Sequence, residues 1–308
     1  MLAIQPGTGP LGATVGGADL RKPVSDSDFA CLLQALGQFG VLRFPAQDLQ
    51  AADLRRFSAR FGGLEVLSAN GRGEPGMPEV SILSNIVRDG APIGIPDAGQ
   101  DWHTDMTYNR TVGFVNVLYA LEVPMRDGHA LGATEFANTQ LAYEDLPEDF
   151  KQRFAQATAT HDFNQFHEHM RRNRGSKRMP LSEEQKRERP PVSHPLFLTH
   201  PITGRKVIYA NPGFTSHIDG LPAKESEGIL AYLFEHVLQP RYRHVHDWTR
   251  GDVLMWDHLG TWHYARPDYG PDEHRLIKRC QVLADSIFNP AFVAAGLRPL
   301  GGPVAASH

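Results

Sequence analysis

The chain has 308 residues, of which 41% are hydrophobic and 21% are charged, and its net charge is −4. These values indicate a folded, water-soluble type of protein and give no reason to expect nucleic acid or an anionic membrane as a partner. The only cysteines are Cys31 and Cys280, too few for a disulfide framework. No segment reaches the roughly 18 apolar residues of a membrane span, and no signal peptide is recognisable. We therefore expect a cytoplasmic location.

Two amphipathic helices and a short strand are expected in the first third of the chain. Residues 25–40 begin with Ser and Asp residues that cap helices and continue with apolar residues at helical spacing. Residues 41–44, VLRF, predict a strand, and residues 51–62 predict a second helix that ends at its glycines. This pattern indicates an α/β portion over about residues 1–77.

From about residue 78 the sequence changes to short apolar segments separated by Gly, Pro and Asn, which is typical of a β-rich domain. A helix is expected over residues 140–157. Strands are expected at residues 80–85, 102–108, 113–123, 133–138 and 157–163.

Residues 164–191 differ from their surroundings, because they contain few aliphatic side chains, many charges and no sustained period. Eight Lys or Arg residues lie between positions 171 and 189. This composition allows two interpretations, a solvated surface segment or a mobile lid over an active site.

The last third alternates between strands and one helix. A hairpin over residues 194–211 turns at the PITG of residues 201–204, and a helix follows at 223–238. Further strands are expected at residues 242–249, 252–265 and 275–285, whereas the Pro- and Gly-rich tail over 286–308 is not informative.

These elements predict an α+β, mainly β fold. Many short strands with polar turns and few helices are typical of a double-stranded β-helix, the jelly-roll of cupin-like proteins, with helices flanking the core. We therefore expect one catalytic domain over residues 1–308, with the β-helix core at about 78–285.

The segment QDWHTDMTY, residues 100–108, places His103 and Asp105 two positions apart. If this segment is extended, both side chains point to the same face and can bind one metal ion. Two His and one carboxylate bind one face of an octahedral Fe(II) and leave the other face open. A second such triplet, His217 to Asp219, precedes a turn, where polar residues are common for other reasons.

A third ligand must come from elsewhere in the chain, and several histidines qualify. They are His167, His169, His244, His246, His258 and His263. His263 is favoured because Arg275 and Arg279 follow it, four residues apart and hence on the same side of a strand. A guanidinium suits a carboxylate near a metal, so one arginine could hold a keto-acid and the other an anionic substrate.

Several longer segments are informative as a set. They are WHTDMTY, TEFANTQLAYEDLP, THDF, HPLFLTHPITGRKVIYANPGFTSHIDGL, GDVLMWDHLGTWHYA and HRLIKR, in this order over roughly residues 20–285. Together they resemble the taurine dioxygenase/chlorophenoxyacetate dioxygenase (TauD/TfdA) family. The resemblance implies an enzyme that uses Fe(II), 2-oxoglutarate and O2 and releases succinate and CO2, with His103, Asp105 and His263 as the iron ligands.

The resemblance also implies roles for residues around the metal. Thr134 and Arg275 match the positions that bind the far carboxylate of 2-oxoglutarate. Arg279 matches an arginine that is often turned to an anionic group of the substrate, and Tyr209 matches an aromatic position of the substrate pocket.

The chain departs from the family pattern at two places. His258, in WDH, stands where the family usually has Asn, and it is an additional potential metal donor. Taurine enzymes carry a His and a Tyr soon after an FG pair, whereas this chain has Leu67 and Asn70. Taurine is therefore not the expected substrate.

The expected activity is hydroxylation of a small, anionic organic molecule such as a sulfonate, a carboxylate or a sulfate ester. An alternative is desaturation, epimerisation or cyclisation of a biosynthetic intermediate with the same cofactors. We expect no nucleic acid and no membrane as partners, because the chain is acidic and lacks an aromatic–basic stacking pattern. A non-catalytic binding module is disfavoured by the complete ligand set, and the resemblance implies a homo-oligomer, a dimer or a tetramer.

Overall fold

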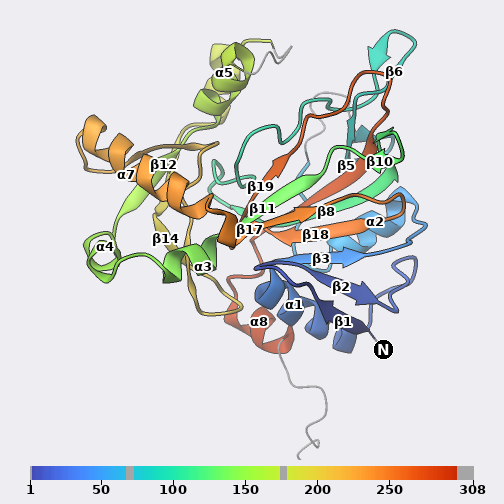
Figure 1. The fold of residues 1–308 in the computed structure, drawn as a ribbon, viewed down its shortest axis with the longest axis horizontal. Coiled ribbons are helices and arrows are strands. Elements are labelled where there is room, and N and C mark those ends of the chain that lie inside the picture. Colours follow the sequence, from blue (N-terminus) through green and yellow to red (C-terminus); the bar gives the residue numbers. More distant parts are fainter. Residues whose placement is uncertain (1, 67–72, 174–178, 297–308) are drawn as a thin grey trace, which may run out of the picture.

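The computed structural model describes residues 2–66, 73–173 and 179–296. An eight-stranded sheet runs through the molecule (Figure 1). Its neighbouring strands are antiparallel except for β2 and β3, which are parallel. In spatial order, the strands are β1 (Ala3–Pro6), β2 (Ala13–Gly16), β3 (Val41–Phe44), β18 (Val253–Asp257), β8 (Gly113–Glu122), β20 (Leu276–Leu283), β5 (Met77–Ser84) and β4 (Gly73–Glu74).

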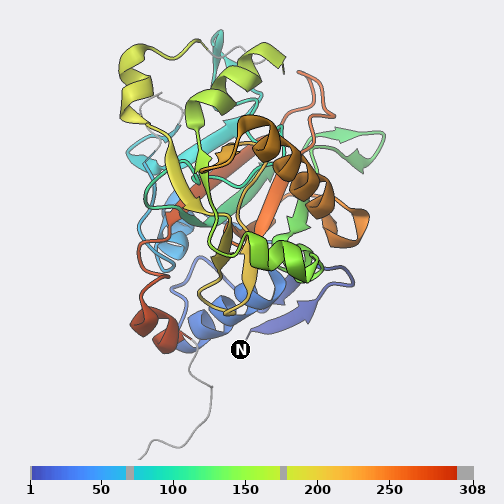
Figure 2. The same ribbon diagram turned by 90° about the vertical axis from the view of Figure 1, so that its left-hand side faces the viewer.

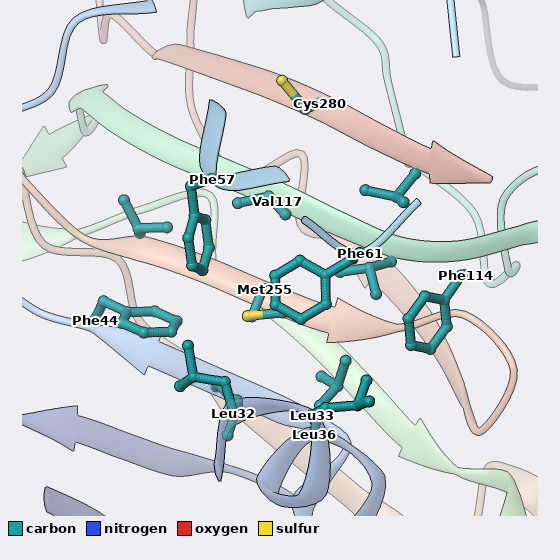
Figure 3. Close-up of a cluster of buried hydrophobic side chains, with 14 of the residues drawn as sticks. Leu32, Leu33, Leu36, Phe44, Phe57, Phe61, Phe114, Val117, Met255 and Cys280 are labelled. Atoms are coloured by element: carbon teal, nitrogen blue, oxygen red, sulfur yellow. The ribbon is translucent and has the colours of Figure 1, made fainter. Parts of the chain in front are cut away.

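One face of this sheet carries the largest apolar core, between the sheet and two helices (Figure 3). Helix α1 (Asp26–Phe39) begins at Ser25, whose side chain caps it, and ends at Gly40 in the left-handed conformation. Helix α2 (Ala51–Ser58) is shorter than predicted, whereas α1 and strand β3 confirm the predictions. The labelled core residues are Leu32, Leu33, Leu36, Phe44, Phe57, Phe61, Phe114, Val117, Met255 and Cys280.

A three-stranded sheet packs against the large sheet through a second apolar cluster. It consists of β17 (Arg243–His246), β11 (Thr134–Asn138) and β19 (Thr261–Ala265). Phe136 of β11 and Trp256 of β18 pack there with their rings 5.3 Å apart. The two sheets therefore share an interior.

A further layer has its own core, in which α7 (Ala223–Val237) packs near α3 (Thr139–Glu144) and α4 (Glu148–Arg153) (Figure 1). The predicted hairpin is confirmed, since β14 (Phe197–Thr199) pairs with β15 (Lys206–Ile208). A further sheet has the order β13 (Val192–Pro195), β12 (Thr158–His161) and β16 (Thr215–Ile218). The short elements are β6 (Val87–Arg88), β7 (Ala91–Pro92), β9 (Met125–Arg126), β10 (His129–Ala130) and the 3-10 helix η2 (Pro240–Tyr242).

Two predicted elements are each divided in the structure. The helix expected over 140–157 is two helices, α3 (Thr139–Glu144) and α4 (Glu148–Arg153), because Pro147 cannot continue α3 and starts α4 instead. The strand expected over 252–265 is β18 and β19, with a turn between them whose backbone is bound by Asp257.

The segment 164–191 contains regular structure that its composition does not predict. Helices α5 (Phe163–Asn173) and α6 (Glu183–Glu188) lie together at one end of the molecule, at the top of Figure 2. Helix α5 buries Phe166 and Met170, so the interpretation as a wholly solvated segment is wrong for this helix. Residues 174–178 of the segment lie outside the described residues.

The tail contains one helix, α8 (Pro290–Gly296), whose Phe292 ring lies 6.0 Å from that of Phe29 on α1. Residues 297–308 lie outside the described part of the chain. Among the described helices, none combines the length and the apolar character that crossing a membrane requires.

Candidate metal centre

Three buried side chains meet in the interior between the two sheets. One donor atom from each of His103, Asp105 and His263 lies within 4.8 Å of the other two. Nε2 of His103 is 3.3 Å from Oδ1 of Asp105, and Nε2 of His263 is 3.8 Å from Oδ2 of the same carboxylate. The structure therefore brings together the three residues that the sequence predicts as iron ligands.

The local conformation that joins His103 and Asp105 differs from the prediction. His103 forms an isolated bridge with His263 of β19 through two backbone hydrogen bonds of 3.1 and 2.8 Å. After it the chain turns, and buried Met106 has a φ of 64°. The strand expected over 102–108 is therefore wrong, and a turn, rather than the pleat of a strand, brings the two side chains together.

Both imidazoles are held in a state that can bind a metal. Nδ1 of His103 lies 2.7 Å from the carbonyl oxygen of Asp101. Since a carbonyl only accepts, Nδ1 carries the proton, and the lone pair of Nε2 is directed to the site. Burial holds the pKa of His263 well below its usual value, so that this ring is neutral.

Asp105 is held by three donors on one oxygen. The amide nitrogens of Asn116 and Gln281 each donate to Oδ2 at 2.9 Å, and Nη1 of Arg279 lies 3.5 Å from it. Burial raises the pKa of Asp105, but its contact with His103 and the charge of Arg279 outweigh burial and hold this pKa well below its usual value. The carboxyl group is therefore ionised, as a metal ligand must be.

Asn116 and Gln281 support the site and were not among the residues predicted from the sequence. Each is the single strongly polar residue in an apolar run, FVNVLYA on β8 and CQVL on β20. Both side chains are almost fully buried, with exposed fractions of 1% and 4%. The signal that could have identified them is a single amide side chain at an inward position of a central strand, because a buried amide needs a hydrogen-bond partner.

The metal group shares a cavity with two further predicted residues, Thr134 and Arg275. Burial lowers the pKa of Arg275. Among the described residues, no carboxylate lies within 4.0 Å of this guanidinium. Oγ1 of Thr134 accepts a hydrogen bond of 3.0 Å from Nε1 of Trp248. A buried, unneutralised guanidinium beside a metal group can bind a carboxylate of a ligand.

Other predicted residues lie away from the cavity or outside the metal group. Tyr209 is 2% exposed and lies among core residues, with its ring 5.8 Å from those of His161 and His194, and it does not line the cavity in the described structure. The ring of His258 lies 5.9 Å from that of His263.

The remaining histidines do not extend the metal group. Within the described ranges, none of the histidines at 167, 169, 217, 244, 246 and 258 belongs to a His, Cys, Asp and Glu group with metal-binding geometry. Asp219 instead accepts hydrogen bonds of 2.6 Å from Thr158 and Thr160. Leu67 and Asn70 lie outside the described residues.

The turn before His263 is fixed by a buried hydrogen-bond network around Asp257. Oδ2 of Asp257 lies 2.9 Å from Nε2 of His200, and both side chains are fully buried. The same carboxylate accepts hydrogen bonds of 2.9 Å from the backbone N–H groups of Leu259 and Gly260. This network positions the start of β19 and, through it, His263.

Asp257→Ala is expected to lower the free energy of unfolding by about 3 to 5 kcal/mol, because it leaves the buried His200 and two backbone donors without a partner. Chemical denaturation measures this change. Asp48→Ala, at an exposed position, is the control and should change the value by no more than about 0.5 kcal/mol. Equal effects of the two substitutions would contradict the role of this network.

Known proteins resemble this chain over most of its length. The family model described as taurine catabolism dioxygenase TauD, TfdA family matches residues 3–281. Pentalenolactone F synthase from Streptomyces avermitilis is 33% identical over 91% of this chain and 93% of its own length. The alpha-ketoglutarate-dependent 2,4-dichlorophenoxyacetate dioxygenase of a Burkholderia species is 32% identical over 86% of this chain and 88% of its own length.

Solved structures show the same similarity. The structure of AAD-2 in complex with Mn(II) and N-oxalylglycine has a TM-score of 0.77 and 26% identity, and the match covers 92% of this chain and 98% of AAD-2. A putative alpha-ketoglutarate-dependent taurine dioxygenase from Burkholderia xenovorans has a TM-score of 0.75 and 26% identity, over 93% and 94% of the two chains. This chain belongs to the TauD/TfdA family of 2-oxoglutarate-dependent, non-haem iron dioxygenases.

Proposed function

We propose that His103, Asp105 and His263 bind Fe(II) and that Arg275 and Thr134 bind the far carboxylate of 2-oxoglutarate. The observation that carries this proposal is the buried ligand group that shares a cavity with the unneutralised guanidinium of Arg275. Two imidazoles and one ionised carboxylate form the donor set that suits Fe(II) in oxygenases of this type. The residues present therefore fit both the metal and the co-substrate.

The bound iron and 2-oxoglutarate would supply the oxidising power for insertion of oxygen into a C–H bond, with release of succinate and CO2. The protein supports this chemistry by position and by exclusion of water. Asn116 and Gln281 fix the carboxylate of Asp105, and Asp101 fixes the tautomer of His103. The burial of the three ligands keeps bulk water away from the reacting centre.

The two sheets that enclose the site support the finer assignment of the fold. We propose that the strands of the eight-stranded and three-stranded sheets that lie within about residues 78–285 form the double-stranded β-helix, within one catalytic domain of residues 1–308. In this proposal the segment 164–191 is a lid, since Phe166 of α5 stacks 6.2 Å from the ring of His103. A cytoplasmic homo-oligomer, a dimer or a tetramer, belongs to the same proposal.

The proposed substrate is a small organic anion, such as a sulfonate, a carboxylate or a sulfate ester. Arg279 lies next to the metal ligand Asp105 and would contact the substrate anion. Its buried Nε has no hydrogen-bond partner among the described residues. Tyr209 belongs to the same proposal only through its matching position in the sequence. Hydroxylation is the proposed outcome.

A second outcome is desaturation, epimerisation or cyclisation with the same cofactors. The 33% identity to pentalenolactone F synthase favours keeping this candidate, because that name describes a synthase and not a catabolic enzyme. Reaction under ¹⁸O₂ separates the outcomes, because of these reactions only hydroxylation inserts an oxygen atom into the product. The hydroxylated product should therefore be about 2 mass units heavier under ¹⁸O₂ than under ¹⁶O₂, and the other products should not change.

The metal and the co-substrate can be tested before any substrate is known. Under anaerobic conditions, addition of Fe(II) and 2-oxoglutarate together is expected to produce a weak visible charge-transfer band, because the keto-acid chelates the iron. Neither addition alone should give the band, and a chelator should remove it. Absence of the band, together with absence of 2-oxoglutarate binding by calorimetry, would contradict the proposed function.

A further inference from the structure

A group of aromatic side chains, which we call the aromatic wall, lies on the outer side of the metal ligands. It consists of Tyr108, Phe163, Phe166 and Phe214. The rings of Phe166 and Phe214 lie 6.2 and 5.9 Å from that of His103. They contact each other at 4.4 Å, and Tyr108 lies 4.7 Å from Phe214 and 4.9 Å from Phe163. The wall therefore leads from the iron ligand His103 to Phe163.

A guanidinium lies at the far end of the aromatic wall. The side chain of Arg189, which follows α6, has its Cζ 4.5 Å from the ring centre of Phe163 and 6.0 Å from that of Tyr108. Its carbonyl oxygen accepts a hydrogen bond of 3.2 Å from Asn164 of α5, which ties the end of α6 to the start of α5. Stacking on rings orients the planar group and leaves its N–H edge available.

The charge of Arg189 is not neutralised by an ion pair within the described structure. No carboxylate of the described residues lies within 4.0 Å of it. Glu65 is close enough for the charge of Arg189 to act on it, but burial raises the pKa of Glu65 and weakens it as a counter-ion. Arg279, by contrast, has a carboxylate of Asp105 at 3.5 Å. Of Arg189 and Arg279, the two guanidiniums that could bind an anion of the substrate, Arg189 is thus the one without a carboxylate partner.

We infer that Arg189 is a specificity-determining residue that binds the anionic group of the substrate, while the aromatic wall holds an apolar, cyclic body between this group and the metal. This inference rests on the proposed function, assigns the anionic group to Arg189 in place of Arg279, and narrows the substrate class to a ring system with a carboxylate or a similar anion at one end. An apolar ring gains from burial against Phe166 and Phe214, and a planar carboxylate matches the fork of Arg189.

The test compares carboxylates with their neutral amides on the complete protein. The probes are 3-phenylpropionate and cyclohexylacetate, each beside its amide, and their affinities are measured by calorimetry in the presence of Mn(II) and 2-oxoglutarate. For the wild type we expect each acid to bind about 10- to 100-fold more tightly than its amide, which is the effect of one charge-assisted contact. Arg189→Gln is expected to reduce this ratio to about one and to leave the affinity for the amides unchanged.

Two variants make the result specific. Arg189→Lys should keep part of the preference for the acids, because it retains the charge but not the planar fork. Arg187→Gln, which removes an exposed arginine of α6 two residues before Arg189, should keep the whole preference for the acids. A merely structural role of Arg189 would weaken acids and amides equally. Three outcomes would overturn the inference. They are an equal weakening of acids and amides in Arg189→Gln, a wild type that does not prefer the acids, and no binding of any probe.

Failure of the inference can be told from failure of the proposed function. The anaerobic band with Fe(II) and 2-oxoglutarate does not depend on Arg189, which lies in the segment after α6 and not in the cavity of Arg275. If the band forms in the wild type and in Arg189→Gln while the preference for acids is absent, only the substrate assignment is wrong. If the band is absent from both, the proposed function itself is wrong.

Discussion

Replacing His263 by alanine is expected to weaken the binding of Fe(II) by at least about 100-fold, because the site then keeps two protein ligands in place of three. The remaining donors, His103 and Asp105, lie before a turn on the other side of the site and cannot close around the metal alone. Anaerobic titration with Fe(II), or electron paramagnetic resonance of bound Mn(II), measures this loss without any substrate. Circular dichroism shows whether the variant is folded.

His258→Asn is the matched control for His263→Ala. His258 is a buried histidine of the same turn region, its ring lies 5.9 Å from that of His263, and burial lowers its pKa to about 4. It does not belong to the ligand group, so this variant should bind Fe(II) with the affinity of the wild type. If His258→Asn lost the metal and His263→Ala kept it, the assignment of the third ligand would be wrong.

The identity of the ligands could be predicted from the sequence, but their geometry could not. His103 and Asp105 are neighbours in the chain, so almost any local conformation keeps them within reach of one ion. The predicted strand is absent because the segment makes only one bridge, His103 to His263, before it turns at Met106. Periodicity describes regular elements, and a turn that carries ligands has none.

The two residues that hold Asp105, Asn116 and Gln281, could not be predicted from the sequence for a different reason. Asn116 and Gln281 are 165 positions apart in β8 and β20, and they meet on Asp105 only because these two strands pair in the large sheet. Their register pairs the two residues directly. Strand order across a sheet is a tertiary property, so no local pattern predicts which polar residues face one carboxylate.

The helices of residues 164–191 show the same limit at the outer side of the site. The many charges of this segment hide Phe166 and Met170, whose burial depends on Phe214 from a distant part of the chain. Propensity and composition therefore indicated a solvated segment where packing produces a wall of the site. The elements with regular apolar spacing, such as α1 and β8, needed no such partner to be recognised.

Arg275→Gln is expected to raise the Kd for 2-oxoglutarate on the order of 10²- to 10³-fold and to leave the affinity for Fe(II) unchanged. The guanidinium is buried, burial lowers its pKa, and no described carboxylate pairs with it, so the ligand supplies the missing counter-charge. Calorimetry under anaerobic conditions with Mn(II) in the site measures both affinities. Arg275→Lys should lie between the wild type and the glutamine variant, because it keeps the charge without the fork.

A shorter keto-acid shows where Arg275 acts. 2-Oxobutyrate keeps the chelating end of 2-oxoglutarate and lacks the far carboxylate, so Arg275→Gln should leave its affinity unchanged. A loss of both affinities would place Arg275 at the chelating end and contradict the assignment. The same substitution removes a buried charge that has no partner in the free protein, and it should therefore not lower the free energy of unfolding, in contrast to Asp257→Ala. A residue whose removal lowers affinity without lowering stability is retained for its ligand, and this property separates Arg275 from Asp257, whose hydrogen bonds stabilise the fold.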